Sequence, residues 1–266
     1  MPGQPPDDTV ARLLELLAEP PERPDFSRGY LDLLGDTDQA GPSTGVTQRL
    51  MRAELVTAIY EDYWRPGLGR VLKGPRGPSM AGEVELAVER LRLAPGHTVL
   101  DVACGTGRFT RAFGTAVGTP AGGGSEGAGL AVGLDGSHPM LARAVERTAR
   151  QSAVAYLRGD AVALPLAADT VDALCCFAAL HMFADPEAAL DSFARTLKPG
   201  GRIVLLASGL RKRQPARTFD LAGGRLAGLR MFERGEVAEL LSQRGFTEIT
   251  QDFHGVAQIV AATFTR

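Results

Sequence analysis

The first chemical feature of this sequence is a glycine-containing turn between an apolar strand and a helix. Residues 99–110 read Val-Leu-Asp-Val-Ala-Cys-Gly-Thr-Gly-Arg-Phe-Thr, so Gly105 and Gly107 stand where the strand ends and the helix begins. Glycine adopts positive φ and lets a ligand approach the backbone closely. In an open α/β sheet this turn lies beside a helix N-terminus, at the edge where ligands bind. The pattern therefore predicts a ligand site here, and the strand-turn-helix context makes it more informative than the Gly-x-Gly pair alone.

Two acidic side chains accompany this turn. Asp101 lies inside the first strand, and Asp135 follows the second apolar strand. A carboxylate inside the first strand can cap the turn or bond the loop amides. A carboxylate after the second strand either caps the next helix, in competition with Ser137, or accepts hydrogen bonds from ribose hydroxyls. The strand-end position of Asp135 favours ribose recognition.

A nicotinamide dinucleotide is the competing ligand for such a turn. Its fingerprint requires a third Gly or Ala three residues after the second glycine, and Thr110 stands there instead. It also requires an acidic residue about 20 residues further on, whereas Asp135 comes 30 residues after Gly105. The Gly-rich stretch 118–129 accounts for the extra distance. Thr110 and the acid inside the first strand are therefore the features that argue against a dinucleotide.

Alternating strands and helices after residue 97 predict an α/β fold. The expected strands cover residues 99–103, 130–134, 154–158, 171–178, 202–207, 247–253 and 256–264. The expected helices cover residues 109–117, 139–150, 187–197 and 234–244. The last two strands flank His254-Gly255 and predict an antiparallel hairpin. We therefore expect a doubly wound, mainly parallel seven-stranded sheet that ends in this hairpin.

The N-terminal residues have a different pattern. Apolar spacing predicts helices over residues 10–19, 27–34, 46–64 and 83–93, with a polar linker at 35–44 and a loop at 67–82. We expect residues 1–82 to form a helical cover on the substrate side and residues 83–266 to form the ligand-binding domain. Tyr60, Tyr63 and Trp64 share one face of the third helix, where they either pack or form a lid.

Composition excludes several classes of protein. The chain has 266 residues, 29 Lys or Arg and 31 Asp or Glu, so its formal net charge of −2 gives no general reason to bind nucleic acid. Its three cysteines have neither disulfide nor zinc spacing. No apolar run reaches the roughly 18–20 residues of a membrane span, and the N-terminus lacks the blocks of a signal peptide. We expect a cytoplasmic protein without a metal site.

These motifs together resemble the class I S-adenosylmethionine-dependent methyltransferases, and especially the small-molecule branch that includes ubiquinone and menaquinone C-methyltransferases. The resemblance covers roughly residues 83–264, with the motifs in the family's order. The matching segments are residues 99–107, 133–137, 159–166, 169–181 and 197–202. The N-terminal 80 residues match only loosely, and the 118–129 loop departs from the compact family core.

The resemblance implies S-adenosyl-L-methionine as the cofactor and assigns residues to it. Asp101 would hold the methionine ammonium, the loop backbone would wrap the amino-acid end, and Asp160 would accept a hydrogen bond from the adenine. Met140 and Asp160 also have plainer interpretations, as a core residue and as a turn residue. The full implied set is Asp101, Ala103, Gly105, Gly107, Asp135, Gly136, Met140, Asp160, Ala161 and Phe177.

The implied reaction is in-line methyl transfer to carbon or oxygen of a small-molecule acceptor, by a monomer or homodimer. His181 follows the fourth strand on the ligand side, where it either packs or orients the acceptor and takes its proton. Arg211, Lys212, Arg213 and Arg217 form a basic cluster that is either a solvated face or a contact for an anionic substrate or membrane. The alternatives are a non-methylating reaction on the same fold and a nicotinamide-dependent oxidoreductase.

Overall fold

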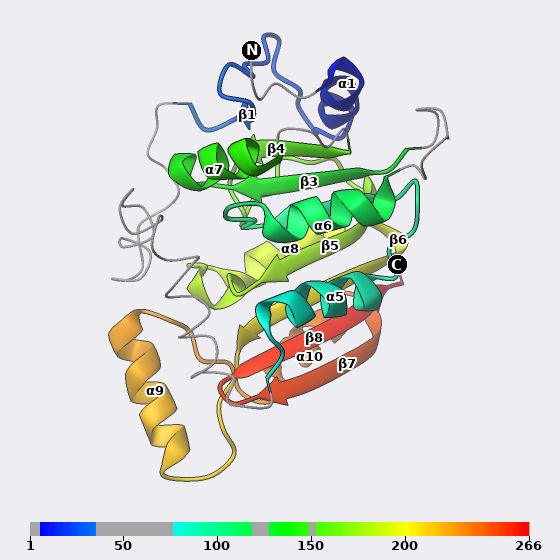
Figure 1. Cartoon of the computed structure of the whole chain (residues 1–266). Coiled ribbons are helices and arrows are strands. Elements are labelled where there is room, and N and C mark those ends of the chain that lie inside the picture. The colour runs from blue at the N-terminus through cyan, green and yellow to red at the C-terminus, as the bar shows by residue number, and fades with distance from the viewer. Residues whose placement is uncertain (1–5, 36–76, 119–127, 149–152, 266) are drawn as a thin grey trace.

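The computed structural model describes residues 6–35, 77–118, 128–148 and 153–265 (Figure 1). Their strands form one eight-stranded sheet in the order β1-β4-β3-β2-β5-β6-β8-β7. Neighbouring strands are parallel except β8, which runs antiparallel to β6 and β7. The strands are β1 (Leu31–Asp32), β2 (Thr98–Val102), β3 (Leu130–Asp135), β4 (Val154–Arg158), β5 (Val171–Phe177), β6 (Leu197–Ser208), β7 (Phe246–His254) and β8 (Ala257–Phe264). The predicted doubly wound fold is confirmed, with eight strands instead of seven.

Helices cover both faces of the sheet. Ser79 caps α5 by accepting a hydrogen bond from the Gly82 N–H at 3.1 Å, and Asp185 caps α8 through the Ala188 N–H at 2.9 Å. In Figure 1, α5, α6 and α7 lie on one face, with α8 and α10 behind the sheet. The helices are α1 (Asp7–Glu15), α5 (Met80–Leu91), α6 (Arg108–Val117), α7 (His138–Thr148), the short 3-10 helix η2 (Leu180–Met182), α8 (Pro186–Thr196), α9 (Ala216–Ala227) and α10 (Glu236–Ser242).

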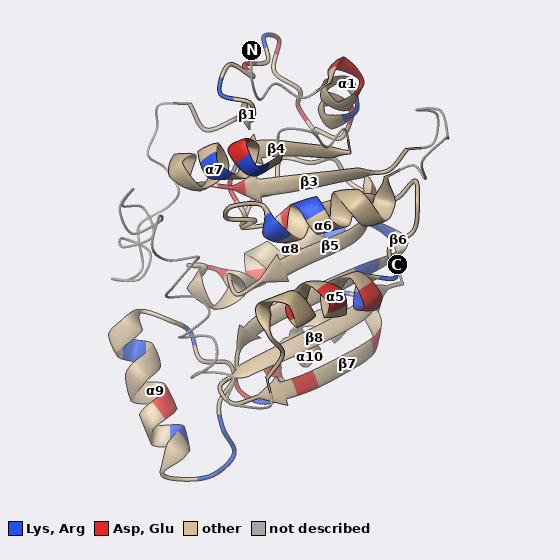
Figure 2. Ribbon diagram, in the orientation of Figure 1, with Lys and Arg blue, Asp and Glu red and all other residues tan. Residues whose placement is uncertain are grey.

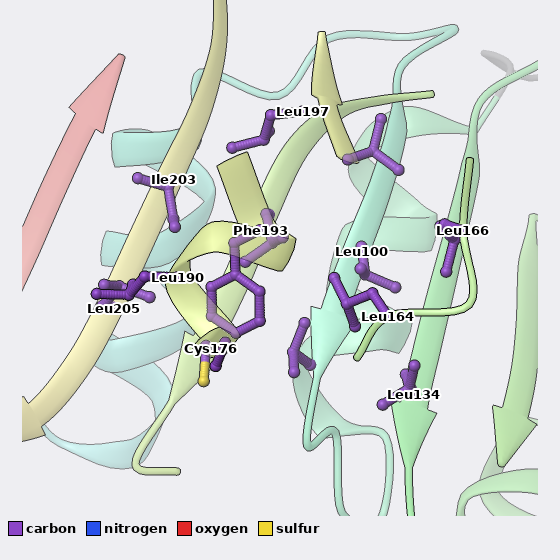
Figure 3. Close-up of a cluster of buried hydrophobic side chains, with 14 of the residues drawn as sticks. Leu100, Leu134, Leu164, Leu166, Cys176, Leu190, Phe193, Leu197, Ile203 and Leu205 are labelled. Carbon is purple, nitrogen blue, oxygen red and sulfur yellow. The ribbon is translucent and has the colours of Figure 1, made fainter. Parts of the chain in front are cut away.

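Two hydrophobic clusters lie on the two faces of the sheet. Adjacent Cys175 and Cys176 on β5 point to opposite clusters, as the pleat of a strand requires, and both are free thiols. One cluster holds the inner side of α8, where the Phe193 ring lies among side chains of several strands (Figure 3). Both faces of the central strands are therefore buried, as the run at 171–178, apolar except for Asp172, predicts.

The segment before the linker departs from its predicted structure. Residues 27–34 were expected to be helical, and that prediction is wrong: Leu31 and Asp32 form β1, which pairs in parallel with β4. Leu13 and Phe26 pack into the same core as the central strands. The predicted helix at 46–64, with Tyr60, Tyr63 and Trp64, lies outside the described residues, as does most of the 118–129 loop.

The strand order places a ligand site at one point of the sheet edge. The chain runs outward from β2 to β3 and β4, and then crosses back to β5 on the other side of β2. Ligands of doubly wound sheets bind at the carboxyl ends of the strands where the order reverses. The turns after β2, β3, β4 and β5 meet at this switch point, and they contain the predicted site residues.

Candidate functional site

The turn after β2 is held in an unusual backbone conformation. Ala103, Gly105 and Gly107 have φ values of 56°, 55° and 74°. An alanine in this region costs free energy, and such residues concentrate at ligand sites. The turn is tied to its neighbour because the Cys104 N–H donates to the Leu134 carbonyl at 3.0 Å. Its shape is therefore fixed by β3 as well as by its own glycines.

The two glycines of this turn are needed for different reasons. A Cβ on Gly107 would collide with the Tyr156 hydroxyl and come within 2.8 Å of the ring carbon Cζ. A Cβ on Gly105 would meet only the Met140 sulfur, at 4.0 Å. Gly107 therefore makes room for a buried tyrosine, whereas Gly105 faces open space beside Met140. Of these two glycines, Gly105 is the one that leaves room for a ligand.

Asp135 joins two turns at the end of β3. Its Oδ2 accepts a hydrogen bond from the Gly105 N–H at 2.8 Å, and its Oδ1 accepts one from the Ser137 N–H at 2.9 Å. Burial raises the pKa of this carboxyl, although the backbone N–H groups oppose the shift. The Ser137 hydroxyl lies 3.4 Å from the Met140 N–H at the start of α7. Ser137 therefore takes the helix-capping position, and Asp135 links the turns after β2 and β3.

Asp101 and Thr110 form a buried pair between β2 and α6. Asp101 is 2% exposed, and its Oδ2 accepts a hydrogen bond from the Thr110 hydroxyl at 2.6 Å. Thr110 is the residue that replaces the third small residue of a dinucleotide fingerprint, and its side chain is fully buried. The threonine therefore fixes the acid of the first strand. This role could not be read from the sequence, which showed Thr110 only as a mismatch.

The remaining predicted cofactor residues have plain structural roles in addition to any ligand role. Asp160 closes a local turn because its Oδ1 accepts a hydrogen bond from the Val162 N–H at 2.8 Å. The Phe177 ring lies 4.7 Å from the Phe109 ring of α6. Ala161 is partly buried against the core. These contacts neither require nor prevent the adenine contacts predicted for Asp160 and Ala161.

His181 lies in η2, directly after β5. Its Nδ1 is sealed from solvent and has no hydrogen-bond partner among the described residues. Burial lowers the pKa of His181 to about 4, so the imidazole is neutral at pH 7. Its backbone carbonyl accepts a hydrogen bond from the Arg230 N–H at 2.9 Å. The side chain thus offers an unused polar atom on the ligand side of the sheet.

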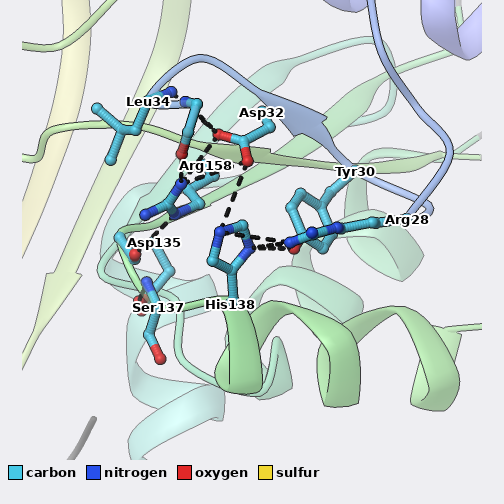
Figure 4. Close-up of polar contacts among 10 residues, drawn as sticks. Arg28, Tyr30, Asp32, Leu34, Asp135, Ser137, His138 and Arg158 are labelled. Carbon is cyan, nitrogen blue, oxygen red and sulfur yellow. Dashed lines mark hydrogen bonds and ion pairs between the residues drawn. The ribbon is translucent and has the colours of Figure 1, made fainter. Parts of the chain in front are cut away.

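A buried arginine supports the site, in a role that the sequence motifs do not predict. Arg158, the last residue of β4, is 3% exposed, and its Nε donates to the Gly136 carbonyl at 3.0 Å. Its Nη1 donates to both Asp32 carboxylate oxygens, at 3.2 and 3.3 Å, and to the Gly35 carbonyl at 2.7 Å. Figure 4 shows this arginine between β1 and the Asp135 turn. A charged residue in a buried strand implies that a partner exists. The sequence does not show which residue that partner is, because Asp32 lies 126 positions away.

Two kinds of feature are absent from the described part of the chain. No group of three or more His, Cys, Asp or Glu side chains there is placed to hold a metal ion. None of the described helices is long and apolar enough to cross a membrane. The switch point, the glycine turn after β2 and the acid after β3 together define a Rossmann-like domain with a site for a nucleoside-containing ligand.

Comparison with known proteins relates part of the chain to methyltransferases. Residues 100–205 match the methyltransferase domain family. The chain is 36% identical over 122 residues to a 2-phytyl-1,4-naphtoquinone methyltransferase of Thermosynechococcus vestitus, covering 46% of this chain and 51% of that protein. It is 32% identical over 183 residues to an uncharacterized chloroplastic methyltransferase of Arabidopsis thaliana, covering 66% of this chain and 48% of that protein. The chain therefore spans about half the length of these curated relatives.

A solved structure shows the same fold. A phosphoethanolamine N-methyltransferase of Haemonchus contortus, solved with S-adenosylhomocysteine and phosphomonomethylethanolamine, superposes with a TM-score of 0.65 at 15% identity. The match covers 82% of this chain and 59% of that one. Residues 100–205 match a methyltransferase domain, and the fold is that of S-adenosylmethionine-dependent methyltransferases, as the sequence motifs predict.

Proposed function

We propose that this protein transfers a methyl group from S-adenosyl-L-methionine to carbon or oxygen of a small-molecule acceptor. The observation that carries the proposal is the Asp135 carboxylate, which is half-buried at the end of β3 and bonded to the turn that contains Gly105. A carboxylate in this position suits the paired hydroxyls of a ribose. The methyltransferase family match over residues 100–205 supports the same assignment.

The residues present fit this cofactor chemically. Each carboxylate oxygen of Asp135 accepts one amide hydrogen bond and retains acceptor capacity for a hydroxyl. Asp101 supplies a negative charge toward an ammonium, and the loop of Ala103, Gly105 and Gly107 supplies backbone groups. Gly136, Met140, Asp160, Ala161 and Phe177 complete the proposed site along the ends of β3, β4 and β5.

The protein's part in the reaction is binding, orientation and exclusion of water. S-adenosyl-L-methionine supplies a methyl group activated on a sulfonium, which needs neither a metal nor a covalent nucleophile. His181 is neutral at pH 7 and has a pKa of about 4, so it is a weak base. We assign its buried Nδ1 a hydrogen bond that orients the acceptor, with proton uptake confined to acceptors that are themselves acidic.

The experiment that tests the cofactor is a calorimetric titration with S-adenosylmethionine, S-adenosylhomocysteine and NADH in parallel. Binding of the two sulfur nucleosides without NADH is the expected result. Binding of NADH alone would overturn the proposal in favour of an oxidoreductase. The same titration on Asp135→Ala separates a ribose contact from turn support, because S-adenosylhomocysteine affinity is read beside the thermal midpoint of the variant.

The experiment that tests the reaction is an assay for S-adenosylhomocysteine release with a panel of acceptors. The panel begins with reduced naphthoquinones, the class that the name of the Thermosynechococcus relative suggests. His181→Gln should lower turnover while keeping cofactor affinity. Tight cofactor binding with no methylated product from any acceptor would favour the non-methylating alternative on this fold.

The proposal extends to the organisation of the chain. Residues 1–82 are proposed as a substrate-side cover and residues 83–266 as the cofactor domain, in a cytoplasmic monomer or homodimer. Limited proteolysis in the presence and absence of S-adenosylhomocysteine tests the division. Because β1 pairs with β4 and Leu13 packs into the core of the sheet, the expected result is cleavage between the two parts with both fragments held together and cofactor binding retained.

A further inference from the structure

Helix α9 exposes its large apolar side chains. Phe219 is 69% exposed and Leu226 is 83% exposed, and these are the two exposed large hydrophobic side chains of the described residues. They lie seven positions apart and therefore share one face of the helix. The exposed residues between them on this face, Ala222 and Gly223, are small. The result is an apolar helix face with no covering element among the described parts of the chain.

The opposite side of α9 is held by a polar contact and a close approach instead of by a hydrophobic stripe. Asp220 is buried and accepts hydrogen bonds from the Arg211 guanidinium, with an Nη2–Oδ1 distance of 2.5 Å and an Nε–Oδ2 distance of 3.0 Å. A Cβ on Gly224 would collide with Met231, so the helix lies close to the chain that follows it. These contacts fix the helix with Phe219 and Leu226 facing outward.

The charge around this face is strongly positive. Residues 211–230 contain six Lys or Arg and one Asp, a net charge of +5 in a chain whose net charge is −2, so the other 246 residues sum to −7. Arg217 pairs with Glu233, and Arg230 pairs with Glu236. Lys212, Arg213 and Arg225 are exposed and make no ion pair with any described residue. Figure 2 shows the cations along α9 and the connection before it, at a corner that projects from the sheet.

We propose that α9 docks on an anionic lipid surface, with Phe219 and Leu226 in the interface and the cations of residues 211–230 against the headgroups. A helix with an apolar face and flanking cations binds in the plane of a bilayer interface, and each nearby Lys or Arg strengthens that binding. A second copy fits less well, because a contact of α9 with α9 would bring two +5 segments together. The segment ends at Arg230, which donates its N–H to the His181 carbonyl. Docking of α9 therefore places the lipid near His181, where the methyl acceptor is proposed to bind.

The test is co-sedimentation of the full chain with vesicles of phosphatidylcholine, with and without phosphatidylglycerol. No cofactor is added, so the result is independent of the proposed activity. Binding is expected only with phosphatidylglycerol, and it should weaken as salt is raised. The double variant Phe219→Ser with Leu226→Ser should lower partitioning by about ten-fold or more. Arg225→Glu should lower it by about five-fold or more.

Arg23→Glu is the matched control, since Arg23 is an exposed residue in the segment between α1 and β1. It makes the same charge change away from α9 and should leave binding within about two-fold of the unmodified protein. An equal loss for Arg23→Glu would overturn the proposal, as would the absence of binding to anionic vesicles. A dimer in sedimentation velocity that the Phe219→Ser and Leu226→Ser variant dissociates would assign the face to a second copy and also overturn it. Thermal midpoints of all variants identify any that fail to fold.

Discussion

Replacing His181 with asparagine should remove a pH dependence from the stability of the protein. Burial lowers the pKa of His181 from 6.5 to about 4, and its Nδ1 lacks a partner among the described residues. In the unfolded chain the pKa of His181 returns to its ordinary value of 6.5. Between these two pKa values the unfolded chain holds a proton that the folded chain does not. The free energy of unfolding therefore falls as the pH drops from above 6.5 toward 4.

The size of this effect follows from the two pKa values. A difference of one pKa unit is worth about 1.4 kcal/mol. Moving the protein from pH 7 to pH 5 should therefore reduce the free energy of unfolding by about 2 kcal/mol through His181 alone. At pH 4 the reduction should reach about 3 kcal/mol and then level off, because the folded protein also begins to bind the proton.

Urea unfolding at pH 7 and pH 5 measures this contribution when wild type and His181→Asn are compared. The other titrating groups are common to both proteins and cancel in the difference between the two pH effects. The expected result is a wild-type loss about 2 kcal/mol larger than that of the variant. Equal losses in the two proteins would refute the reasoning, as would an NMR titration of the His181 ring with a midpoint near 6.5.

Four further substitutions test the site. Asp135→Ala should weaken S-adenosylhomocysteine binding more than about ten-fold in calorimetry, and wild-type affinity should fall at acidic pH because burial raises the pKa of this carboxyl; unchanged affinity would remove the ribose role. Gly107→Ala should cost about 3 kcal/mol in urea unfolding, from its φ of 74° and the collision with Tyr156; a variant as stable as wild type would contradict the packing argument. Thr110→Val should cost about 2 kcal/mol, because buried Asp101 loses a hydrogen bond; circular dichroism melting checks it against Thr115→Val on the exposed side of α6. Arg158→Met should cost about 3 kcal/mol and loosen β1, since Asp32 loses its buried partner; hydrogen exchange that is unchanged at Leu33 would count against this.

The fold was predictable because each strand of the central sheet carries its own signal. Residues 154–158 and 171–178 are apolar except for Arg158 and Asp172 and are bounded by turn residues, and their predicted limits agree with β4 and β5 to within one residue. The hairpin at His254-Gly255 likewise carries a local turn signal. These elements are set by residues close to one another in the sequence.

The elements that were missed depend on distant partners. β1 is two residues long and exists because Leu31 and Asp32 meet Leu157 and Arg158, more than a hundred positions later. The segment that forms α9 contains Gly223 and Gly224, which lower its helix propensity, and its apolar face with Phe219 and Leu226 is exposed and not part of the core. Neither β1 nor α9 could therefore be recognised from burial of an apolar pattern in its own segment.

The site could be predicted by residue but not by arrangement. The sequence motifs identified Asp101, Gly105 and Asp135, and the structure brings the last two into direct contact. The sequence could not show that Asp135 bonds the Gly105 amide or that Thr110 holds Asp101, because both contacts depend on how strand ends converge. The motifs identify which residues are present, whereas the hydrogen bonds in the structure show which groups each carboxylate contacts.

The ring of Tyr156 links positions that appear independent in the sequence. It is 2% exposed, and both Gly107 and Gly133 would bring a Cβ within 3 Å of its ring atoms. Gly133 lies opposite Tyr156 in the β3–β4 register, and the Tyr156 hydroxyl is 2.9 Å from that of Thr148. The effects of substitutions at Gly107, Gly133 and Tyr156 therefore depend on one another. A side chain at either glycine should cost less stability once residue 156 has become smaller, so laboratory evolution of the cofactor turn should accept changes at Gly107 more readily in backgrounds that have already lost the tyrosine.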